Sequence, residues 1–198
     1  MPNRIEVRQA TTHDVAHIAA LIEPYVAANV LLRKDLVQLY EDVQEFVVAA
    51  DAAGRVVGCG ALHVMWRDLG EIRTILTSDE VRGQGVGHLI LENLMDRART
   101  LRLERLFCLT FETRFFERHG FVAVGEQVVD QPTRQHMLRS TDAGVHEFLE
   151  LPWVKPNTLG NTRMICVLAG SSNTDASELA EPPSASPAPT EHVTDTDR

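Results

Sequence analysis

Apolar residues at helical spacing dominate the early part of the chain. A short alternating stretch, residues 5–8, predicts a first strand. Thr11 and Asp14 form a T-x-x-D pattern that is typical of a helix start. Apolar positions then recur every three or four residues up to residue 26, and Pro24 is expected to kink or end this helix. A second helix is predicted after Asp35, whose side chain is suited to cap it.

The middle of the chain changes to the pattern of strands. Residues 46–50 and 56–64 flank the polar turn DAAGR and predict a β-hairpin. A further turn leads to a strand at 71–77. An amphipathic helix is predicted from about residue 85 to residue 100. The apolar run at 105–111 then predicts a strand covered on both faces.

Shorter elements are predicted in the last part of the chain. A helix at 113–119, ended by Gly120, precedes a strand at 121–124. A helix is expected around 132–140, and the prolines and glycine favour a loop for the rest of the segment up to residue 162. Residues 163–168 predict a last strand. The predicted domain therefore spans residues 1–169, and residues 170–198, rich in Ser, Thr, Pro and acids, predict a disordered tail.

Composition narrows the class of protein. The chain of 198 residues has room for one full core. It has no apolar run near the length of a membrane span and no apolar stretch at its N-terminus, so we expect a cytoplasmic protein without a membrane contact. Its three cysteines, Cys59, Cys108 and Cys166, lie in separate apolar runs and predict buried, reduced thiols. Its net charge is −9 with no basic stripe, which argues against nucleic acid as a partner, and its histidines lack metal-ligand spacing.

The stretch EVRGQGVGHLI, residues 80–90, carries the clearest chemical signal. Three glycines alternate between a predicted strand and a predicted helix. Such a loop leaves backbone N–H groups and the positive end of a helix dipole facing one point, which suits a pyrophosphate. The P-loop and dinucleotide spacings do not fit, whereas R-x-x-G-x-G fits at Arg82–Gly87. The alternative is a glycine-rich turn that only starts a helix.

The glycine loop resembles the acetyl-CoA pyrophosphate loop of the GNAT superfamily of N-acetyltransferases. TRFFERHGF, residues 113–121, is similar to the short helix and strand of that superfamily. VGCGAL, GEIRT, LTFET and LGN resemble amino-acid N-acetyltransferases, in particular the short form of N-acetylglutamate synthase of arginine biosynthesis. The likeness spans about residues 4–168. It implies an α/β (α+β) fold with a mixed, mostly antiparallel sheet, flanking helices and a splayed pair of strands.

The resemblance implies acetyl-CoA as co-substrate and no metal. The residues expected to bind CoA are Ile75, Leu76 and Thr77 of the strand and Arg82, Gly83, Gln84, Gly85, Val86 and Gly87 of the loop. The amine must lose a proton before it attacks, and Glu71 is the predicted base, with Glu112 as runner-up. The alternative for Glu71 is a plain ion pair with Arg73.

Many superfamily members protonate the leaving thiolate with a tyrosine, and Phe116 stands at that position. Thr110 is the replacement that the resemblance suggests. The alternative is that Thr110 is a core residue bonded to backbone, and CoA thiolate can also leave without a dedicated acid.

An acidic acceptor requires cations in the cleft. Arg33 and Lys34 align with a basic pair that the family uses for substrate carboxylates. Arg73, Lys155 and Arg163 are further candidates, because cationic side chains bind carboxylates directly. The family's C-terminal arginine has no clean match near Gly160 and Asn161, which leaves glutamate, glutamine and other amino acids open.

The sequence therefore predicts transfer of acetyl from acetyl-CoA to the α-amine of glutamate or glutamine. The rival hypotheses are an acetyltransferase for a different amine, such as a protein N-terminus, a lysine or a polyamine, and a non-catalytic acetyl-CoA sensor. The pathway makes L-arginine a candidate feedback inhibitor. A homodimer also remains open, since no residue decides either point.

Overall fold

A seven-stranded sheet organises the computed structural model, which describes residues 4–28, 31, 33–125, 128–151 and 160–168. The sheet order is β1-β2-β3-β4-β5-β7-β6, and β4 with β5 is its parallel pair. The expected mixed and mostly antiparallel sheet is confirmed. The strands are β1 Glu6–Gln9, β2 Phe46–Ala50, β3 Val56–Val64, β4 Leu69–Thr77, β5 Arg105–Thr110, β6 Val122–Ala123 and β7 Thr162–Val167.

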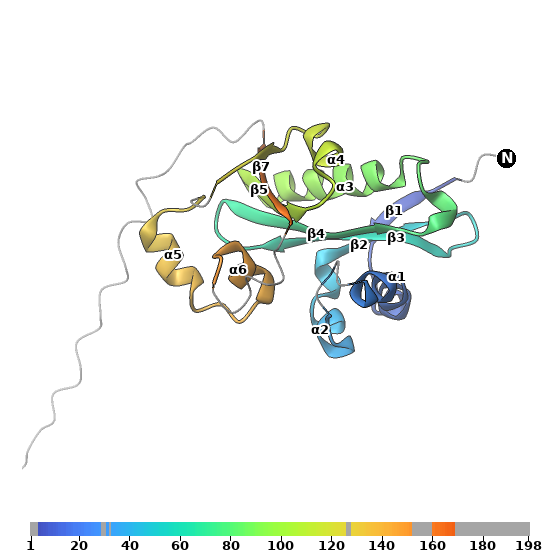
Figure 1. Cartoon of the computed structure of the whole chain (residues 1–198). Coiled ribbons are helices and arrows are strands. Elements are labelled where there is room, and N and C mark those ends of the chain that lie inside the picture. The colour runs from blue at the N-terminus through green and yellow to red at the C-terminus, as the bar shows by residue number, and fades with distance from the viewer. Residues whose placement is uncertain (1–3, 29–30, 32, 126–127, 152–159, 169–198) are drawn as a thin grey trace, which may run out of the picture.

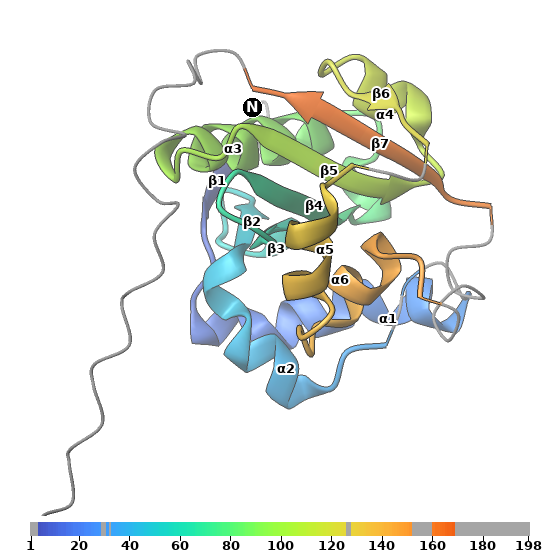
Figure 2. The same ribbon diagram turned by 90° about the vertical axis from the view of Figure 1, so that its left-hand side faces the viewer.

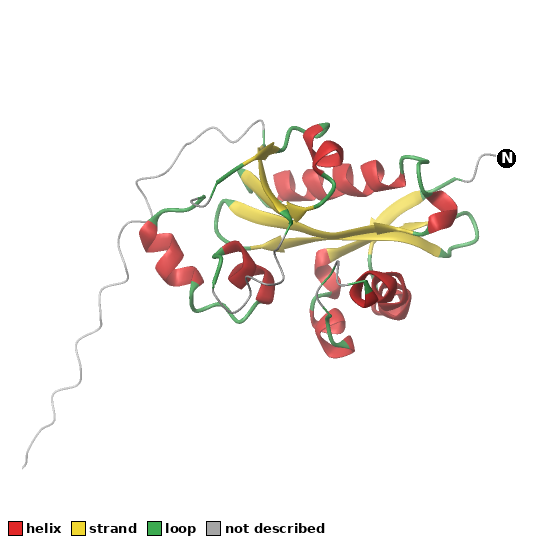
Figure 3. Cartoon of the chain, in the orientation of Figure 1, coloured by secondary structure: helices red, strands yellow, loops and turns green. Residues whose placement is uncertain are grey.

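Helices cover both faces of the sheet (Figures 1 and 3). They are α1 Val15–Ala27, α2 Leu36–Glu41, α3 Val86–Thr100, α4 Thr113–Glu117, α5 Gln131–Met137 and α6 Ala143–Phe148. Short 3-10 turns at Thr12–Asp14, Val43–Glu45 and Asp79–Val81 join some of these elements. Helices α3 and α4 lie on one face, while α1, α2, α5 and α6 lie on the other (Figures 1 and 2).

The long helix α3 builds the larger core. Its apolar stripe, which includes Ile90, Leu91 and Leu94, is fully buried against β2, β3 and β4. A Cβ at Gly60 would lie 2.6 Å from Ile90 and 3.0 Å from Leu94, so the small residues of β3 bring α3 close to the sheet. This packing fixes where the helix begins, and hence where the glycine loop before it lies.

The opposite face carries two further cores. Helices α1 and α2 pack Ile18, Ile22 and Leu39 against β2 and β3. Helices α5 and α6 pack around Phe107 of β5, whose ring meets the ring of Phe148 edge-on at 4.8 Å. Helix α6 is therefore held under the point where β4 and β5 meet.

Most predicted elements are confirmed, with small shifts at their ends. The hairpin strands have the predicted bounds, and all three cysteines are free and buried. The predicted helix starts also hold: Asp14 Oδ2 accepts the backbone N–H of Thr11 at 2.8 Å, and Gln38 Oε1 accepts that of Asp35 at 2.9 Å.

Pro24 does not end helix α1, which continues to Ala27, because Tyr25 and Val26 still pack against the core. One expectation was wrong. The segment expected to be a loop contains α6, whose Val145 and Phe148 are buried. The prolines that argued for a loop come after this helix. The predicted tail, 170–198, lies outside the described residues.

Candidate active site

Strands β4 and β5 separate in the middle of the sheet. They pair only between Leu69–Glu71 and Arg105–Phe107, although β4 continues to Thr77 and β5 to Thr110. On its other edge β4 has a bulge, where the register with β3 shifts between Cys59 and Ala61. Thr74 at this bulge has a φ of 60°, an outlier for a β-branched residue. Beyond Glu71, backbone groups on the β5 side of β4 face the opening between the two strands, as the resemblance implied.

The glycine loop lies directly after β4. Gly83 and Gly85 have φ angles of 75° and 81°, which favour glycine. The first helical hydrogen bond runs from Leu89 N to Gly85 O at 3.2 Å, so the N–H groups of the first turn of α3 have no helical carbonyl to bind. A Cβ at Gly83 or Gly85 would meet no atom within 4 Å, so these glycines border open space. This geometry suits an anion, and Gln84, Val86 and Gly87 lie in the same turn.

Glu71 is the buried carboxylate of the site. It is 4% exposed, and its Oε2 has no hydrogen-bond partner among the described residues. The nearest cationic atom, Arg73 Nη1, is 3.7 Å away. Burial raises the pKa of Glu71, Asp142 raises it further, and Arg73 opposes both effects. A buried carboxylate with a raised pKa and a free oxygen is equipped to accept a proton.

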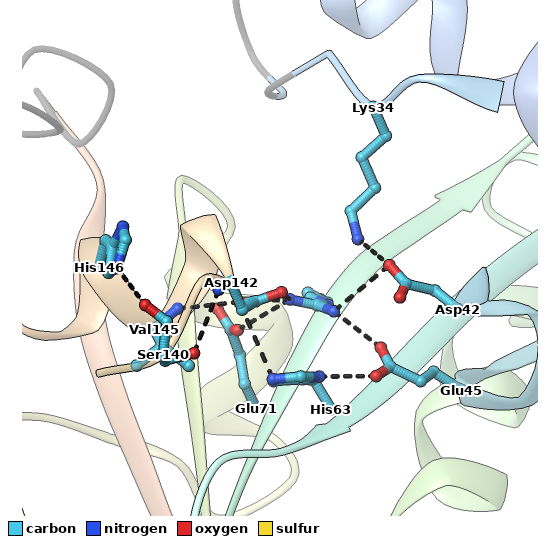
Figure 4. Close-up of polar contacts among 10 residues, drawn as sticks. Lys34, Asp42, Glu45, His63, Glu71, Ser140, Asp142, Val145 and His146 are labelled. Carbon is cyan, nitrogen blue, oxygen red and sulfur yellow. Dashed lines mark hydrogen bonds and ion pairs between the residues drawn. The ribbon is translucent and has the colours of Figure 1, made fainter. Parts of the chain in front are cut away.

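Four carboxylates surround Arg73. Its Nη2 donates to Glu45 Oε2 at 2.7 Å, and its Nη1 lies 3.1 Å from both Asp142 oxygens. Asp42 lies 3.8 Å away, and its Oδ2 accepts a hydrogen bond from Lys34 Nζ at 2.6 Å. The fourth carboxylate is that of Glu71. Burial would lower the pKa of Arg73, but the surrounding carboxylates raise it. The structure thus brings Lys34, Arg73 and Glu71 into one cluster (Figure 4).

His63 and Glu45 belong to this cluster and were missed by the sequence analysis. His63 is directly opposite Glu71 in the β3–β4 ladder, and its Nδ1 lies 2.6 Å from Glu45 Oε1 (Figure 4). Its Nε2 lies 3.8 Å from Asp142 Oδ1. Burial alone would raise the pKa of Glu45, but His63 and Arg73 lower it. The hairpin register could have located His63, because residues opposite each other in a ladder share a face.

The start of α6 closes the cluster from below. Asp142 caps this helix, with its Oδ1 accepting the N–H of Val145 at 3.0 Å (Figure 4). A Cβ at Gly144 would lie 2.7 Å from Glu71 Oε2 and 3.0 Å from Arg73 Nη1, so only glycine fits there without a shift. Glu147 is also part of this helix. Burial, Glu71 and Asp142 raise the pKa of Glu147 to about 7.

Comparison with known proteins assigns this architecture. Residues 14–121 match the Acetyltransferase (GNAT) family. The chain belongs to the GNAT acetyltransferase family. It is 54% identical over 164 residues to an amino-acid acetyltransferase of Mycobacterium tuberculosis, covering 82% of this chain and 94% of that one. An amino-acid acetyltransferase of Neisseria meningitidis is 32% identical over 144 residues, covering 72% of this chain but 33% of that longer one.

Solved structures agree with this assignment. The protein Rv2747 from Mycobacterium tuberculosis, in complex with CoA and NLQ, has a TM-score of 0.80 at 53% identity, covering 82% of this chain and 99% of that one. N-acetylglutamate synthase from Neisseria gonorrhoeae, complexed with coenzyme A and N-acetyl-glutamate, has a TM-score of 0.67 at 26% identity, covering 85% and 36%.

Acetyl-CoA, the co-substrate of this acetyltransferase, fits the loop and strand just described. The open space at Gly83 and Gly85 and the unbonded N–H groups of the first turn of α3 suit a pyrophosphate. Ile75, Leu76 and Thr77 follow the bulge and lie at the opening between β4 and β5. The guanidinium of Arg82 pairs with the carboxylate of Asp79 at 2.9 Å, and both side chains are well exposed. This exposed pair does not hold the guanidinium over the loop. Within the described residues, no group of three or more side chains could hold a metal ion.

The candidate acid of the acetyltransferase, Thr110, is the last residue of β5. Thr110 is buried and its Oγ1 accepts the N–H of Glu112 at 2.9 Å, which leaves its O–H able to donate. Phe116 is buried in the core beside Phe121. The position that carries a tyrosine in many relatives therefore supplies packing here and no proton.

The other predicted substrate cations are not gathered around Glu71. Arg33 is exposed and pairs with Glu23 at 3.2 Å, so the Arg33–Lys34 pair is divided between the surface and the cluster. Arg163 donates to Phe148 O at 2.8 Å and its guanidinium lies 5.1 Å from the centre of the Phe107 ring. Lys155 lies outside the described residues. Among those residues, no helix has both the length and the apolarity to cross a bilayer.

Proposed function

We propose that this acetyltransferase moves acetyl from acetyl-CoA to the α-amine of L-glutamate, or of L-glutamine, as the first step of arginine biosynthesis. Amino-acid N-acetylation is the activity named for the relatives, and the proposal concerns the acceptor and the residues. The observation that carries it is the buried Oε2 of Glu71, which accepts no hydrogen bond from the described residues and lies beside Arg73 at the opening between β4 and β5.

Glu71 is the base in this proposal. The amine nitrogen attacks the thioester carbonyl carbon, and Glu71 takes the proton that the amine loses, directly or through a water. Its raised pKa brings it closer to neutral pH, where a general base is most effective. The C–S bond then breaks and CoA leaves as a thiolate. Thr110 can donate a proton to this sulfur, and its own hydroxyl is replenished from solvent.

Backbone groups of β4 support the thioester. An N–H beyond the bulge, within Ile75–Thr77, is positioned to donate to the carbonyl oxygen as it gains negative charge. The glycine loop holds the pyrophosphate at the far end of the same molecule. Together they fix the acetyl group near Glu71, which lies at the last paired position of β4 with β5.

Lys34 and Arg73 are the proposed ligands of the acceptor carboxylates. Both are less than one quarter exposed, with side-chain values of 22% and 10%. A carboxylate entering the cluster would share these cations with Asp42 and Asp142. Arg163 and Lys155 are proposed to assist from the C-terminal side.

The decisive experiment is a thiol-release assay with acetyl-CoA and each of the twenty amino acids. Turnover with glutamate or glutamine well above the rest supports the proposal. Turnover only with peptides or other amines would assign a different acceptor. Binding of acetyl-CoA without turnover on any amine would identify a sensor and would overturn the proposal.

A further inference from the structure

Glu71 Oε2 accepts no hydrogen bond from the described residues, although a guanidinium is next to it. Glu71 and Arg73 are two residues apart on β4 and so face the same side of the strand. Their closest atoms, Glu71 Oε2 and Arg73 Nη1, are 3.7 Å apart, a loose ion pair that is too long for a hydrogen bond. The donors of Arg73 point to other acids instead. Nη2 is 2.7 Å from Glu45, and Nη1 is 3.1 Å from Asp142.

We propose that Asp142 is a positioning residue that keeps Glu71 free of a hydrogen bond from Arg73 by holding Nη1 of that guanidinium. This inference rests on the proposed role of Glu71 as the base. Asp142 does not touch the reacting atoms in this scheme. Its carboxylate competes with that of Glu71 for one guanidinium nitrogen, and it has the shorter contact.

The local structure fixes Asp142 in that place. Its backbone N–H donates to Ser140 Oγ at 3.1 Å, and its Oδ1 accepts the N–H of Val145 at 3.0 Å. Val145 itself is buried in the core below the sheet, so the start of α6 cannot move away freely. Gly144 then allows the helix to approach Glu71, since a Cβ there would collide with Oε2 at 2.7 Å.

The second acid is held in a similar way. Glu45 follows α2 and receives His63 Nδ1 at 2.6 Å on one oxygen and Arg73 Nη2 at 2.7 Å on the other. Arg73 is thus held between two anchored carboxylates, one on each side. Figure 4 shows Asp142 and Glu45 at opposite ends of this row of contacts, with Glu71 below it.

The charges around Glu71 determine whether its pKa rises or falls when Asp142 loses its charge. Burial raises the pKa of Glu71, Arg73 lowers it, Asp142 raises it, and His63 and Lys34 lower it. The groups that it influences in turn are Cys108 of β5 and Glu147 of α6. Removing the charge of Asp142 removes a repulsion that raises the pKa of Glu71, and it frees Nη1 of Arg73 to approach Oε2. Both changes favour the ionised form of Glu71, so its pKa falls and it becomes a weaker base.

Asp142→Asn tests this inference without removing the helix cap. Asparagine caps a helix about as well as aspartate, so α6 is retained while the charge is lost. The matched control is Asp130→Asn at the start of α5, where Asp130 Oδ1 accepts the N–H of Thr133 at 2.7 Å. Asp130 is not among the charged groups that shift the pKa of Glu71. The measurement is kcat/KM for the best acceptor against pH, since its acidic limb reports the essential base of the free enzyme.

We expect the acidic limb of Asp142→Asn to move to lower pH by about one unit, with a plateau reduced about tenfold. Asp130→Asn should leave both unchanged. An unmoved limb in a folded Asp142→Asn protein would overturn the inference, as would an equal shift in the control. If the asparagine variant unfolds, the same pH profile is measured on Asp142→Ser, because serine also caps a helix.

A separate variant distinguishes this inference from the proposed function. If Glu71→Gln keeps the normal rate, Glu71 is not the base, and both statements fail. If Glu71→Gln is inactive while Asp142→Asn has an unmoved limb, the base assignment stands and the role of Asp142 alone is wrong.

Discussion

Glu71 Oε2 lies 3.7 Å from Arg73 Nη1, too far for a hydrogen bond, in a site where both side chains are almost fully buried. A close, hydrogen-bonded pair would stabilise the ionised carboxylate, lower its pKa and make it a poorer proton acceptor. Here the guanidinium is directed to Glu45 and Asp142, and Glu71 retains an unsatisfied oxygen. An unsatisfied buried carboxylate is costly for stability, and such groups concentrate at functional sites.

Glu71→Gln should lower kcat by about 10²- to 10⁴-fold, because the amide cannot accept the proton of the amine. The dissociation constant for acetyl-CoA should stay the same, since Glu71 is not part of the glycine loop. Steady-state rates and calorimetric titration with CoA measure the two effects separately. Glu6→Gln on β1, an exposed acid, is the control. A kcat within twofold of the normal value would remove Glu71 from the role of base.

Gly85→Val should weaken acetyl-CoA binding by at least about tenfold. Gly85 has a φ of 81° and borders open space, so a valine there is strained and also projects where the pyrophosphate is expected. Gly54→Val is the matched control, because Gly54 has the same φ of 81° and equally open surroundings in the β2–β3 turn. Both variants should lose similar stability in thermal melts. Equal CoA affinity in the two would mean that the loop only starts a helix.

The parts of this site that are local in sequence could be predicted from it. The glycine loop and the strand before it follow from spacing, because a strand, a turn and a helix start are set by neighbouring residues. The choice of Glu71 as base comes from the family resemblance and from its place at the start of that strand. Asp42, Glu45 and His63 required the hairpin register and the path of α2. Asp142 could not be predicted, because the segment before it gives no indication of which face of the sheet α6 covers. Its contact with Arg73 joins residues 69 positions apart.

Gly144→Ala should reduce turnover more than it reduces stability. The added Cβ would lie 2.7 Å from Glu71 Oε2 and 3.0 Å from Asp142 Oδ1, so one of these carboxylates must shift. We expect kcat/KM for the acceptor to fall about tenfold, with CoA affinity unchanged, because small displacements of a base are costly to catalysis. Gly125→Ala, where a Cβ meets nothing within 4 Å, is the control. A normal rate in Gly144→Ala would show that α6 does not restrict the position of Glu71.

The last prediction concerns stability and lies away from the active site. The carboxylate of Asp14, at the start of α1, accepts hydrogen bonds from both terminal nitrogens of Arg8 and from the backbone N–H of Thr11, each at 2.8 Å. The hydrogen bonds from Arg8 lower the pKa of Asp14 well below its ordinary range, against the opposing effect of burial. The folded pKa is therefore below the unfolded one. The carboxylate stabilises the fold above the unfolded pKa of about 4, and this contribution is lost as pH falls towards the folded pKa.

Asp14→Asn should consequently lower the free energy of unfolding by about 1–3 kcal/mol at pH 7, because it weakens charge-assisted hydrogen bonds to a buried acceptor. The difference from the unsubstituted protein should shrink as pH falls below about 4, since the normal carboxylate then begins to lose its advantage. Urea unfolding at pH 7 and at pH 3 measures both values. Asp96→Asn is the control, because Asp96 pairs with Arg99 at 2.7 Å but is 78% exposed, and exposed pairs contribute little. A destabilisation of Asp14→Asn that is the same at both pH values would show that the side chain acts through its shape alone, with no contribution from its charge.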